Sequence, residues 1–176
     1  MIKKLPENRA KPFLRWAGSK KQLIPILKKY WASDYKRYVE PFAGSASLFF
    51  NLIPPSALLS DINEELITTY GQIKNNLEAV LRALQTMNRG RQNYIRLRAM
   101  NPLTMKPAVR AARFIYLNRY CFNGLYRTNQ TGQFNVPYGG NKTGMLPGRS
   151  HLSGCSSCLK VAKLTACSFE KTLEAT

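Results

Sequence analysis

Short apolar runs alternate with longer segments whose apolar residues recur at helical spacing, and this alternation predicts the elements of the chain. The runs predict buried strands and cover residues 38–42, 57–62 and 164–169. The helical segments cover residues 19–31, 63–75, 77–100, 108–120 and a stretch that ends at Lys160. We expect Asn63 to cap the helix after the second strand. Strands that alternate with helices predict a mostly parallel α/β sheet.

One stretch interrupts this alternation. Residues 76–150 combine basic helical segments with a loop rich in Gly, Asn and Thr, and they are too long and too basic for an ordinary crossover. We expect them to form an inserted, mostly helical subdomain. Residues 1–75 then form the first part of the α/β domain, and residues 151–176 return to it.

The charge of the chain narrows the choice of partner. The 176 residues include 27 Lys+Arg against 9 Asp+Glu, a formal net charge of +18, and most of the excess is interspersed with aromatic residues. Such a surface attracts polyanions. A nucleic acid is the favoured partner, while an anionic membrane surface and a merely solvated basic face remain alternatives.

The remaining bulk features concern location and metals. The first 18 residues hold no apolar stretch long enough for a signal peptide, and no later segment approaches a membrane span. We therefore expect a cytoplasmic protein with no membrane partner and with reduced cysteines. Cys155 and Cys158, with His151 nearby, suggest zinc, but a structural site needs four ligands and the second pair is missing. We expect no metal, and instead two small, partly buried residues on a helix.

The junction after the first strand is a candidate ligand site. Gly44 opens a loop, residues 44–51, that leads into a helix, and its backbone can pass close to a ligand at the carboxyl end of a parallel strand. Asp61 ends the second strand and can accept hydrogen bonds from both ribose hydroxyls of an adenosine. The missing G-x-G-x-x-G triplet favours a cofactor without pyrophosphate over a dinucleotide. The alternative is that Gly44 only makes a turn and Asp61 only caps the next helix.

Four ordered motifs carry a resemblance that covers the chain from residue 13 to its end. They are FLRWAGSK at 13–20, VEPFAG at 39–44, SDIN at 60–63, and the stretch 116–127 that runs into 132–139. In this order they resemble the motifs of the Dam-type (class D12) adenine-specific DNA methyltransferases. The resemblance implies an incomplete Rossmann-like S-adenosylmethionine-dependent methyltransferase sheet with an inserted DNA-recognition subdomain.

The resemblance implies a site for S-adenosylmethionine. Trp16 and Lys20 match residues that contact this cofactor, and Asp61 matches the carboxylate that binds its ribose. An aromatic surface, a ribose carboxylate and close backbone approach suit a sulfonium cofactor. The rest of the wall is expected from Phe42, Gly44 and Phe169, the last of which is similar to an aromatic residue that lies against the adenine.

The resemblance also implies how the insert binds double-stranded DNA. Arg127 matches an arginine that takes guanine by its major-groove acceptors. Neighbours that touch bases or fill the space of an extruded adenine are matched by Asn123, Leu125 and Pro137. Arg15 stands where a basic residue contacts the first base pair. This set favours GATC as the target, and the alternative is that the basic residues contact only phosphates.

Two positions depart from the family pattern. Ser19 stands where the pattern has a second glycine. Asn141 stands where the pattern leads us to expect another DNA contact, so the outer base pair is expected to be read loosely.

Asn135 begins a tetrapeptide, Asn-Val-Pro-Tyr, that is close to the catalytic Asp-Pro-Pro-Tyr of the family. It precedes the third strand, whereas the catalytic tetrapeptide follows that strand, and Val136 replaces the first proline. We therefore assign no catalytic residue and expect a chain truncated before the true motif. Little or no turnover is expected unless another chain supplies it, and an open sheet edge predicts self-association or such a complementing chain.

Two functional classes stay open. The first is an enzyme that transfers methyl from S-adenosylmethionine to the 6-amino group of adenine in duplex DNA, with base flipping. The second is a catalytically inactive remnant that at most binds DNA. A dinucleotide-dependent oxidoreductase is disfavoured by the missing glycines and by the net charge of +18.

Overall fold

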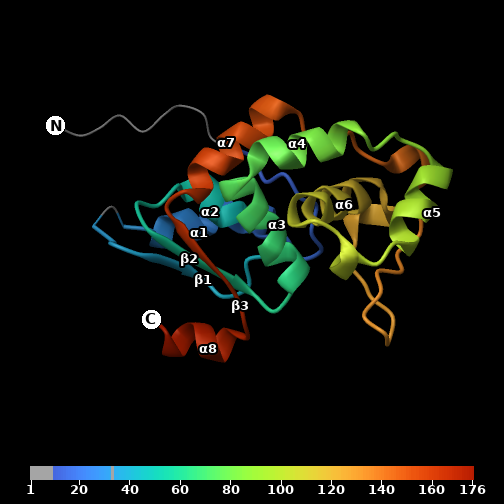
Figure 1. Cartoon of the computed structure of the whole chain (residues 1–176). Coiled ribbons are helices and arrows are strands. Elements are labelled where there is room, and N and C mark those ends of the chain that lie inside the picture. The colour runs from blue at the N-terminus through green and yellow to red at the C-terminus, as the bar shows by residue number, and fades with distance from the viewer. Residues whose placement is uncertain (1–9, 33) are drawn as a thin grey trace.

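The computed structural model describes residues 10–32 and 34–176. Residues 1–9 therefore lie outside the described residues. They belong to the predicted first part of the α/β domain, and they make up half of the 18 residues in which no signal peptide is expected. Three strands form one parallel sheet in the order β1-β2-β3 (Figure 1). They are β1 (Tyr38–Glu40), β2 (Ala57–Asp61) and β3 (Ala162–Ala166). The predicted parallel α/β sheet is confirmed, and the carboxyl ends of its strands share one edge.

The third strand is displaced from its predicted position. It begins two residues before the predicted run, at Ala162, and ends at Ala166. Phe169 starts the helix α8 (Phe169–Glu174), whose first turn is closed by a bond from the Thr172 N–H to the Ser168 carbonyl. The prediction that Phe169 ends the strand is wrong because the chain turns into α8 at Ser168, its N-cap residue, and the acidic Glu170 in the first turn favours a helix start there.

The helices of the α/β part follow local signals. The predicted helix 19–31 consists of three short pieces, η1 (Lys20–Leu23), α1 (Ile24–Leu27) and η2 (Lys28–Tyr30). Proline lacks an N–H group and is tolerated only near a helix start, so Pro25 fits the first turn of α1. The other helices are α2 (Ser47–Leu52), α3 (Glu64–Asn75) and α7 (Arg149–Leu159).

The predicted cap of α3 is confirmed. The Asn63 side chain accepts a hydrogen bond of 3.0 Å from the Leu66 N–H. This bond satisfies one of the free donors at the start of the helix. It also fixes the path of the chain directly after β2, where Asp61 stands.

The insert holds α4 (Leu77–Gln85), α5 (Arg91–Ala99), η3 (Pro102–Thr104), α6 (Pro107–Tyr120), η4 (Phe122–Gly124) and η5 (Gly140–Lys142). The single helical region predicted for residues 77–100 is two helices, because Gly90 has a φ of +143° that a helix excludes. Two antiparallel bridges, Cys121 with Tyr138 and Thr128 with Phe134, define a hairpin of residues 121–138. Figure 1 shows α5 and this hairpin at the end of the molecule away from the strands.

The insert is docked on the α/β part through α3. Helix α6 packs along both α3 and α4, and Arg110 of α6 forms an ion pair with Glu65 of α3. One buried cluster runs through both parts and includes Phe49, Tyr70 and Tyr116. The two candidate functional regions are therefore held by a common core.

Candidate functional site

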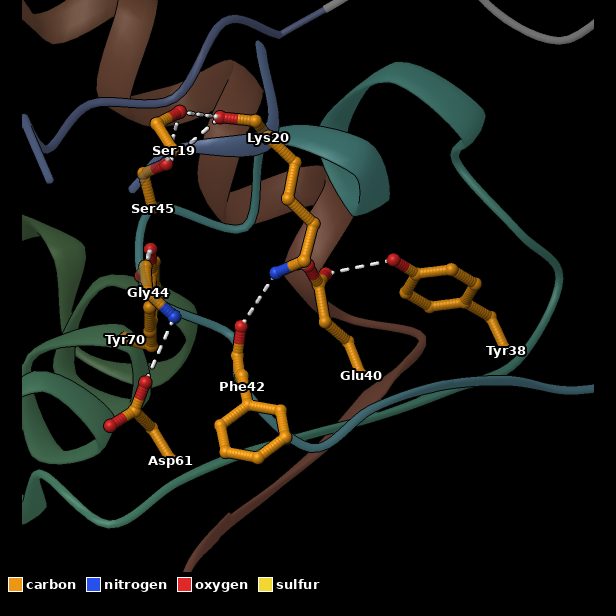
Figure 2. Close-up of polar contacts among 10 residues, drawn as sticks. Ser19, Lys20, Tyr38, Glu40, Phe42, Gly44, Ser45, Asp61 and Tyr70 are labelled. Atoms are coloured by element: carbon orange, nitrogen blue, oxygen red, sulfur yellow. Dashed lines mark hydrogen bonds and ion pairs between the residues drawn. The ribbon is translucent and has the colours of Figure 1, made fainter. Parts of the chain in front are cut away.

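The loop after β1 is fixed by side chains on both sides. The Gly44 N–H donates to Asp61 Oδ2 at 2.9 Å (Figure 2). The Gly44 carbonyl accepts from the Tyr70 hydroxyl at 2.7 Å. Asp61 Oδ1 accepts from the Asn63 N–H at 3.0 Å. A Cβ atom on Gly44, whose φ is +48°, would lie 2.7 Å from Cδ1 of Trp16. Both the conformation and the close approach therefore require glycine.

This loop borders a cavity of about 210 Å³. Five of the six residues predicted for the cofactor line it, namely Trp16, Lys20, Phe42, Gly44 and Asp61. The remaining lining comes from residues 17–19, 43, 45 and 47. Three motifs that are separate in the sequence thus meet at the carboxyl edge of the sheet, where open α/β sheets bind ligands.

The sixth predicted residue, Phe169, lies outside the cavity lining. Its ring centroid is 5.3 Å from that of Phe42, with an interplanar angle of 30°. Both rings are well exposed, Phe42 at 61% and Phe169 at 41%. Phe169 therefore extends the aromatic wall that Phe42 begins.

Lys20 reaches the loop from the N-terminal segment. Its Nζ donates to the Phe42 carbonyl at 2.8 Å and forms an ion pair of 3.0 Å with Glu40 Oε1. The Tyr38 hydroxyl donates to the other carboxylate oxygen of Glu40 at 2.8 Å. Burial raises the pKa of Glu40, and the Lys20 ammonium opposes the rise. Sequence reasoning did not select Glu40, although a carboxylate inside a short buried strand signals a paired charge.

Three serine hydroxyls join the two segments that line the cavity. Ser19 lies 2.7 Å from Ser47 and 3.0 Å from Ser45, and Ser45 lies 2.8 Å from Ser47, all measured between Oγ atoms. Ser19 departs from the family pattern at this position, and its hydroxyl now braces the N-terminal segment against the glycine loop. Apart from the departure itself, no sequence pattern predicted this contact.

Trp16 connects the cavity to the insert. Its ring stacks on Tyr126 of the hairpin at 5.7 Å and 21°, and on Phe114 of α6 at 6.3 Å and 26°. The wall of the cavity is therefore also a packing surface of the hairpin.

Arg127 lies on the exposed part of the hairpin. Its Nε donates to Asn135 Oδ1 at 2.8 Å, and the Asn135 N–H donates to the Arg127 carbonyl at 3.0 Å. The side-chain bond engages one of the five guanidinium donors and limits the rotation of the group. This geometry suits an arginine that presents its terminal nitrogens to a partner.

The other residues predicted to bind DNA lie on the hairpin or against it. Asn123 has a left-handed φ of +52°, Leu125 is 37% exposed, and the carbonyl of exposed Pro137 accepts from the Phe122 N–H at 2.9 Å. Asn141 is exposed just beyond the hairpin.

Arg15 joins this group from the N-terminal segment. Its N–H and carbonyl bond to the Asn118 side chain at 2.8 and 2.7 Å. Its side chain covers Gly124 so closely that a Cβ there would clash. The structure thus brings all five predicted DNA-binding residues to one region.

Sequence comparison identifies the family of this chain. A model of the D12 class N6 adenine-specific DNA methyltransferases matches residues 16–176. The chain belongs to this family. Similar proteins include the Type II methyltransferase M1.LlaDCHI of Lactococcus lactis subsp. cremoris, 36% identical over 172 residues, which cover 93% of this chain and 61% of that protein.

Two further similar proteins are also named as a methyltransferase and a DNA methylase. The Type II methyltransferase M.MjaIII of Methanocaldococcus jannaschii is 33% identical over 91% of this chain and 63% of its own length. The DNA adenine methylase of Haemophilus influenzae is 33% identical over 96% of this chain and 60% of its own length. The chain spans about three fifths of the length of these curated relatives.

In this chain, the tetrapeptide that begins at Asn135 has a structural role. Val136 is 2% exposed, and its carbonyl accepts hydrogen bonds from the Tyr94 hydroxyl at 2.8 Å and from Arg98 at 3.2 Å. The segment is part of the folded hairpin, and that it only resembles the catalytic motif stays a prediction.

A second cavity, of about 660 Å³, lies between α5, α6 and the hairpin. Aromatic residues of α6 and the hairpin, Phe114, Tyr126 and Phe134, line it together with the buried Arg113. Sequence reasoning did not predict it, because its walls come from segments far apart in the chain.

The structure places the cysteine pair on a helix, as predicted. Cys155 and Cys158 are buried on α7, and burial raises the pKa of Cys155 to about 12. His151 Nε2 lies 2.6 Å from the Lys11 carbonyl. Residues 10–32 and 34–176 contain no group of three or more His, Cys, Asp or Glu able to hold a metal ion. Within those same ranges, no helix has the length and apolar character to cross a bilayer.

Proposed function

We propose that the 210 Å³ cavity binds S-adenosylmethionine and that the hairpin binds duplex DNA, in a protein that methylates the 6-amino group of adenine. The observation that carries the proposal is the convergence of Trp16, Lys20, Phe42, Gly44 and Asp61 on one cavity. The printed names of the relatives, Type II methyltransferase and DNA adenine methylase, support the same activity.

The residues of the cavity fit this cofactor chemically. Each oxygen of Asp61 accepts one backbone N–H, so lone pairs remain for the two ribose hydroxyls. The rings of Trp16 and Phe42 offer π faces to a sulfonium cation, and Gly44 permits close backbone approach. When bound, the cofactor would supply an electrophilic methyl group.

The hairpin is proposed to read the target sequence. Arg127 would take the guanine of GATC through its major-groove acceptors. Asn123, Leu125 and Pro137 would contact bases or fill the space left by a flipped adenine, and Arg15 would contact the first base pair. The net charge of +18 favours the phosphate backbone of duplex DNA as the partner.

A second proposal shares these binding sites. The 176 residues contain no Asp-Pro-Pro-Tyr or Asn-Pro-Pro-Tyr tetrapeptide. Such a motif accepts hydrogen bonds from the adenine amino group and orients it, and positioning of this kind is a large part of catalysis. On this observation, the chain by itself would bind cofactor and DNA without turnover.

The first test concerns cofactor binding. Asp61→Ala should weaken S-adenosylmethionine binding by about 1.5–3 kcal/mol, the contribution of hydrogen bonds to a charged group. Isothermal titration calorimetry measures this. Glu64→Ala, which removes a carboxylate three residues later with a 75% exposed side chain, should leave the affinity unchanged. Equal affinities of the folded Asp61→Ala variant and the wild type would remove Asp61 from the site.

The second test separates the two proposals. The wild-type chain is incubated with methyl-labelled S-adenosylmethionine and a duplex that contains GATC. Label in the DNA supports the enzyme, whereas binding of both ligands without label supports a binding role for this chain.

A further inference from the structure

We infer that Tyr70 is a positioning residue for the cofactor, because it fixes the backbone of the glycine loop from beneath the cavity. The inference rests on the proposed binding of S-adenosylmethionine. It concerns a residue of α3 that does not line the cavity and that the sequence motifs did not select.

Tyr70 is held rigidly. It is fully buried, and its ring meets Phe13 edge-on at 5.3 Å and 81° and lies 6.5 Å from Phe50. Its hydroxyl donates to the Gly44 carbonyl at 2.7 Å. Burial raises the pKa of the phenol well above its usual value, so the hydroxyl keeps the proton that it donates. A buried, clamped ring leaves the hydroxyl few other positions to occupy.

The Gly44 peptide groups depend on this bond. The Gly44 N–H is bound by Asp61 (Figure 2) and the Gly44 carbonyl by Tyr70, so side chains bind both polar groups. Glycine has a wide range of accessible backbone conformations, and the φ of +48° seen here is only one of them. Without the Tyr70 hydroxyl, the carbonyl loses its partner and the Gly44–Ser45 peptide that carries it can rotate. The φ and ψ angles of Gly44 are then no longer fixed from that side, so the preceding peptide, whose N–H donates to Asp61, loses its fixed position relative to the carboxylate proposed to bind the ribose.

A second tyrosine provides a matched comparison. Tyr94 of α5 is also fully buried, and its hydroxyl donates to the Val136 carbonyl in the hairpin at 2.8 Å. Removal of either hydroxyl takes one donor from a buried loop carbonyl, although the Val136 carbonyl keeps a second donor, Arg98 at 3.2 Å. Tyr94→Phe should therefore cost no more stability than Tyr70→Phe, and the two changes fall under different binding regions.

The experiment compares Tyr70→Phe and Tyr94→Phe with the wild-type chain. S-adenosylmethionine affinity is measured by calorimetry, binding of a GATC duplex by fluorescence anisotropy, and folding by thermal melts. Tyr70→Phe should bind the cofactor about tenfold more weakly, the effect of one unsatisfied buried acceptor, and should bind the duplex as the wild type does. Tyr94→Phe should bind the cofactor as the wild type does and should bind the duplex more weakly, by a smaller factor because Arg98 still donates to the Val136 carbonyl.

The outcomes are distinct. If the wild type binds no cofactor, the proposed function fails and the inference fails with it. If the wild type binds and Tyr70→Phe binds equally well, only the inference is overturned. Equal weakening of cofactor binding in both variants would indicate general destabilisation and would also overturn it.

A measurement on the wild type covers the case in which Tyr70→Phe does not fold. The Tyr70 hydroxyl proton should exchange slowly with solvent in NMR spectra. Its signal should shift during a titration with S-adenosylmethionine, following the dissociation constant found by calorimetry. A hydroxyl signal that stays in place throughout the titration would overturn the inference.

Discussion

Arg127 carries the prediction for DNA specificity. Its guanidinium is oriented through Nε by Asn135 and lies on the exposed part of the hairpin. A bidentate contact with one guanine contributes about 1–3 kcal/mol of discrimination. Arg127→Ala should therefore lose about that much preference for GATC over duplexes in which the guanine is replaced, as measured by anisotropy.

A basic residue elsewhere on the insert provides the control. Arg91 is exposed at the start of α5, and Arg91→Ala should weaken all duplexes alike or have no effect. If Arg127→Ala also weakens every duplex equally, Arg127 anchors the DNA without reading it, and the assignment of GATC loses its main support.

Glu40 gives the folded chain a pH dependence. Burial raises its pKa above the usual value, so the folded chain holds this proton more tightly than the unfolded chain does. The contribution of Glu40 to the free energy of unfolding is fully present below the pKa that Glu40 has in the unfolded chain. It is lost as the pH rises through the pKa of Glu40 in the folded chain. Lys20→Met removes the ammonium that opposes the rise, so the folded pKa should increase further. A carboxyl carbon NMR titration of both proteins measures this, and a lower pKa in Lys20→Met would contradict the assignment.

At the scale of elements, α2 lies between two residues with positive φ, Ala46 at +51° and Ile53 at +49°. The left-handed region is strained for a β-branched residue, by roughly 1–2 kcal/mol. In the middle of a helix or strand, a protein with Ala has a free energy of unfolding about 0.5–1 kcal/mol higher than the same protein with Gly. At position 53 the order should reverse, with Ile53→Gly more stable than Ile53→Ala in urea unfolding. The usual order would show that φ at this residue relaxes to negative values.

The elements also show what can be predicted from the sequence. The cap at Asn63 and the first two strands depend on neighbouring residues. The cap is confirmed, and both strands begin where predicted but end at Glu40 and Asp61, before the predicted ends at residues 42 and 62. The third strand was displaced because the helix start at Ser168 overlaps its apolar run. The irregular geometry of residues 20–30 was also missed, because helical spacing does not separate 3-10 from α turns.

The candidate site also contains residues that could be predicted from the sequence and residues that could not. Resemblance selected residues by type and order, and five of the six cofactor residues line one cavity. It did not select Glu40 or Tyr70, whose partners lie far away in the sequence. It also gave no indication that Trp16 stacks on Tyr126. Contacts of this kind depend on how α3, the glycine loop and the insert pack together.

For the whole molecule, the net charge of +18 predicts strongly salt-dependent DNA binding. A protein that contacts six to ten phosphates loses roughly a thousandfold or more in affinity between about 50 and 200 mM salt. Plots of log affinity against log salt should therefore be steep, and parallel for duplexes with and without GATC. Vesicles of anionic lipid serve as competitor, because the membrane alternative predicts that they displace the duplex.

The sheet topology also has a consequence for how the protein forms during synthesis. Ala57 of β2 pairs with Ala162 of β3, so about a hundred residues must leave the ribosome before the last strand can join. At roughly 5–20 residues per second, this delay lasts several seconds. Helices α4 to α6 rely on local contacts and can form within that time, whereas β2 keeps an open edge. We therefore expect the insert to fold and to pack against α3 before β3 pairs with β2.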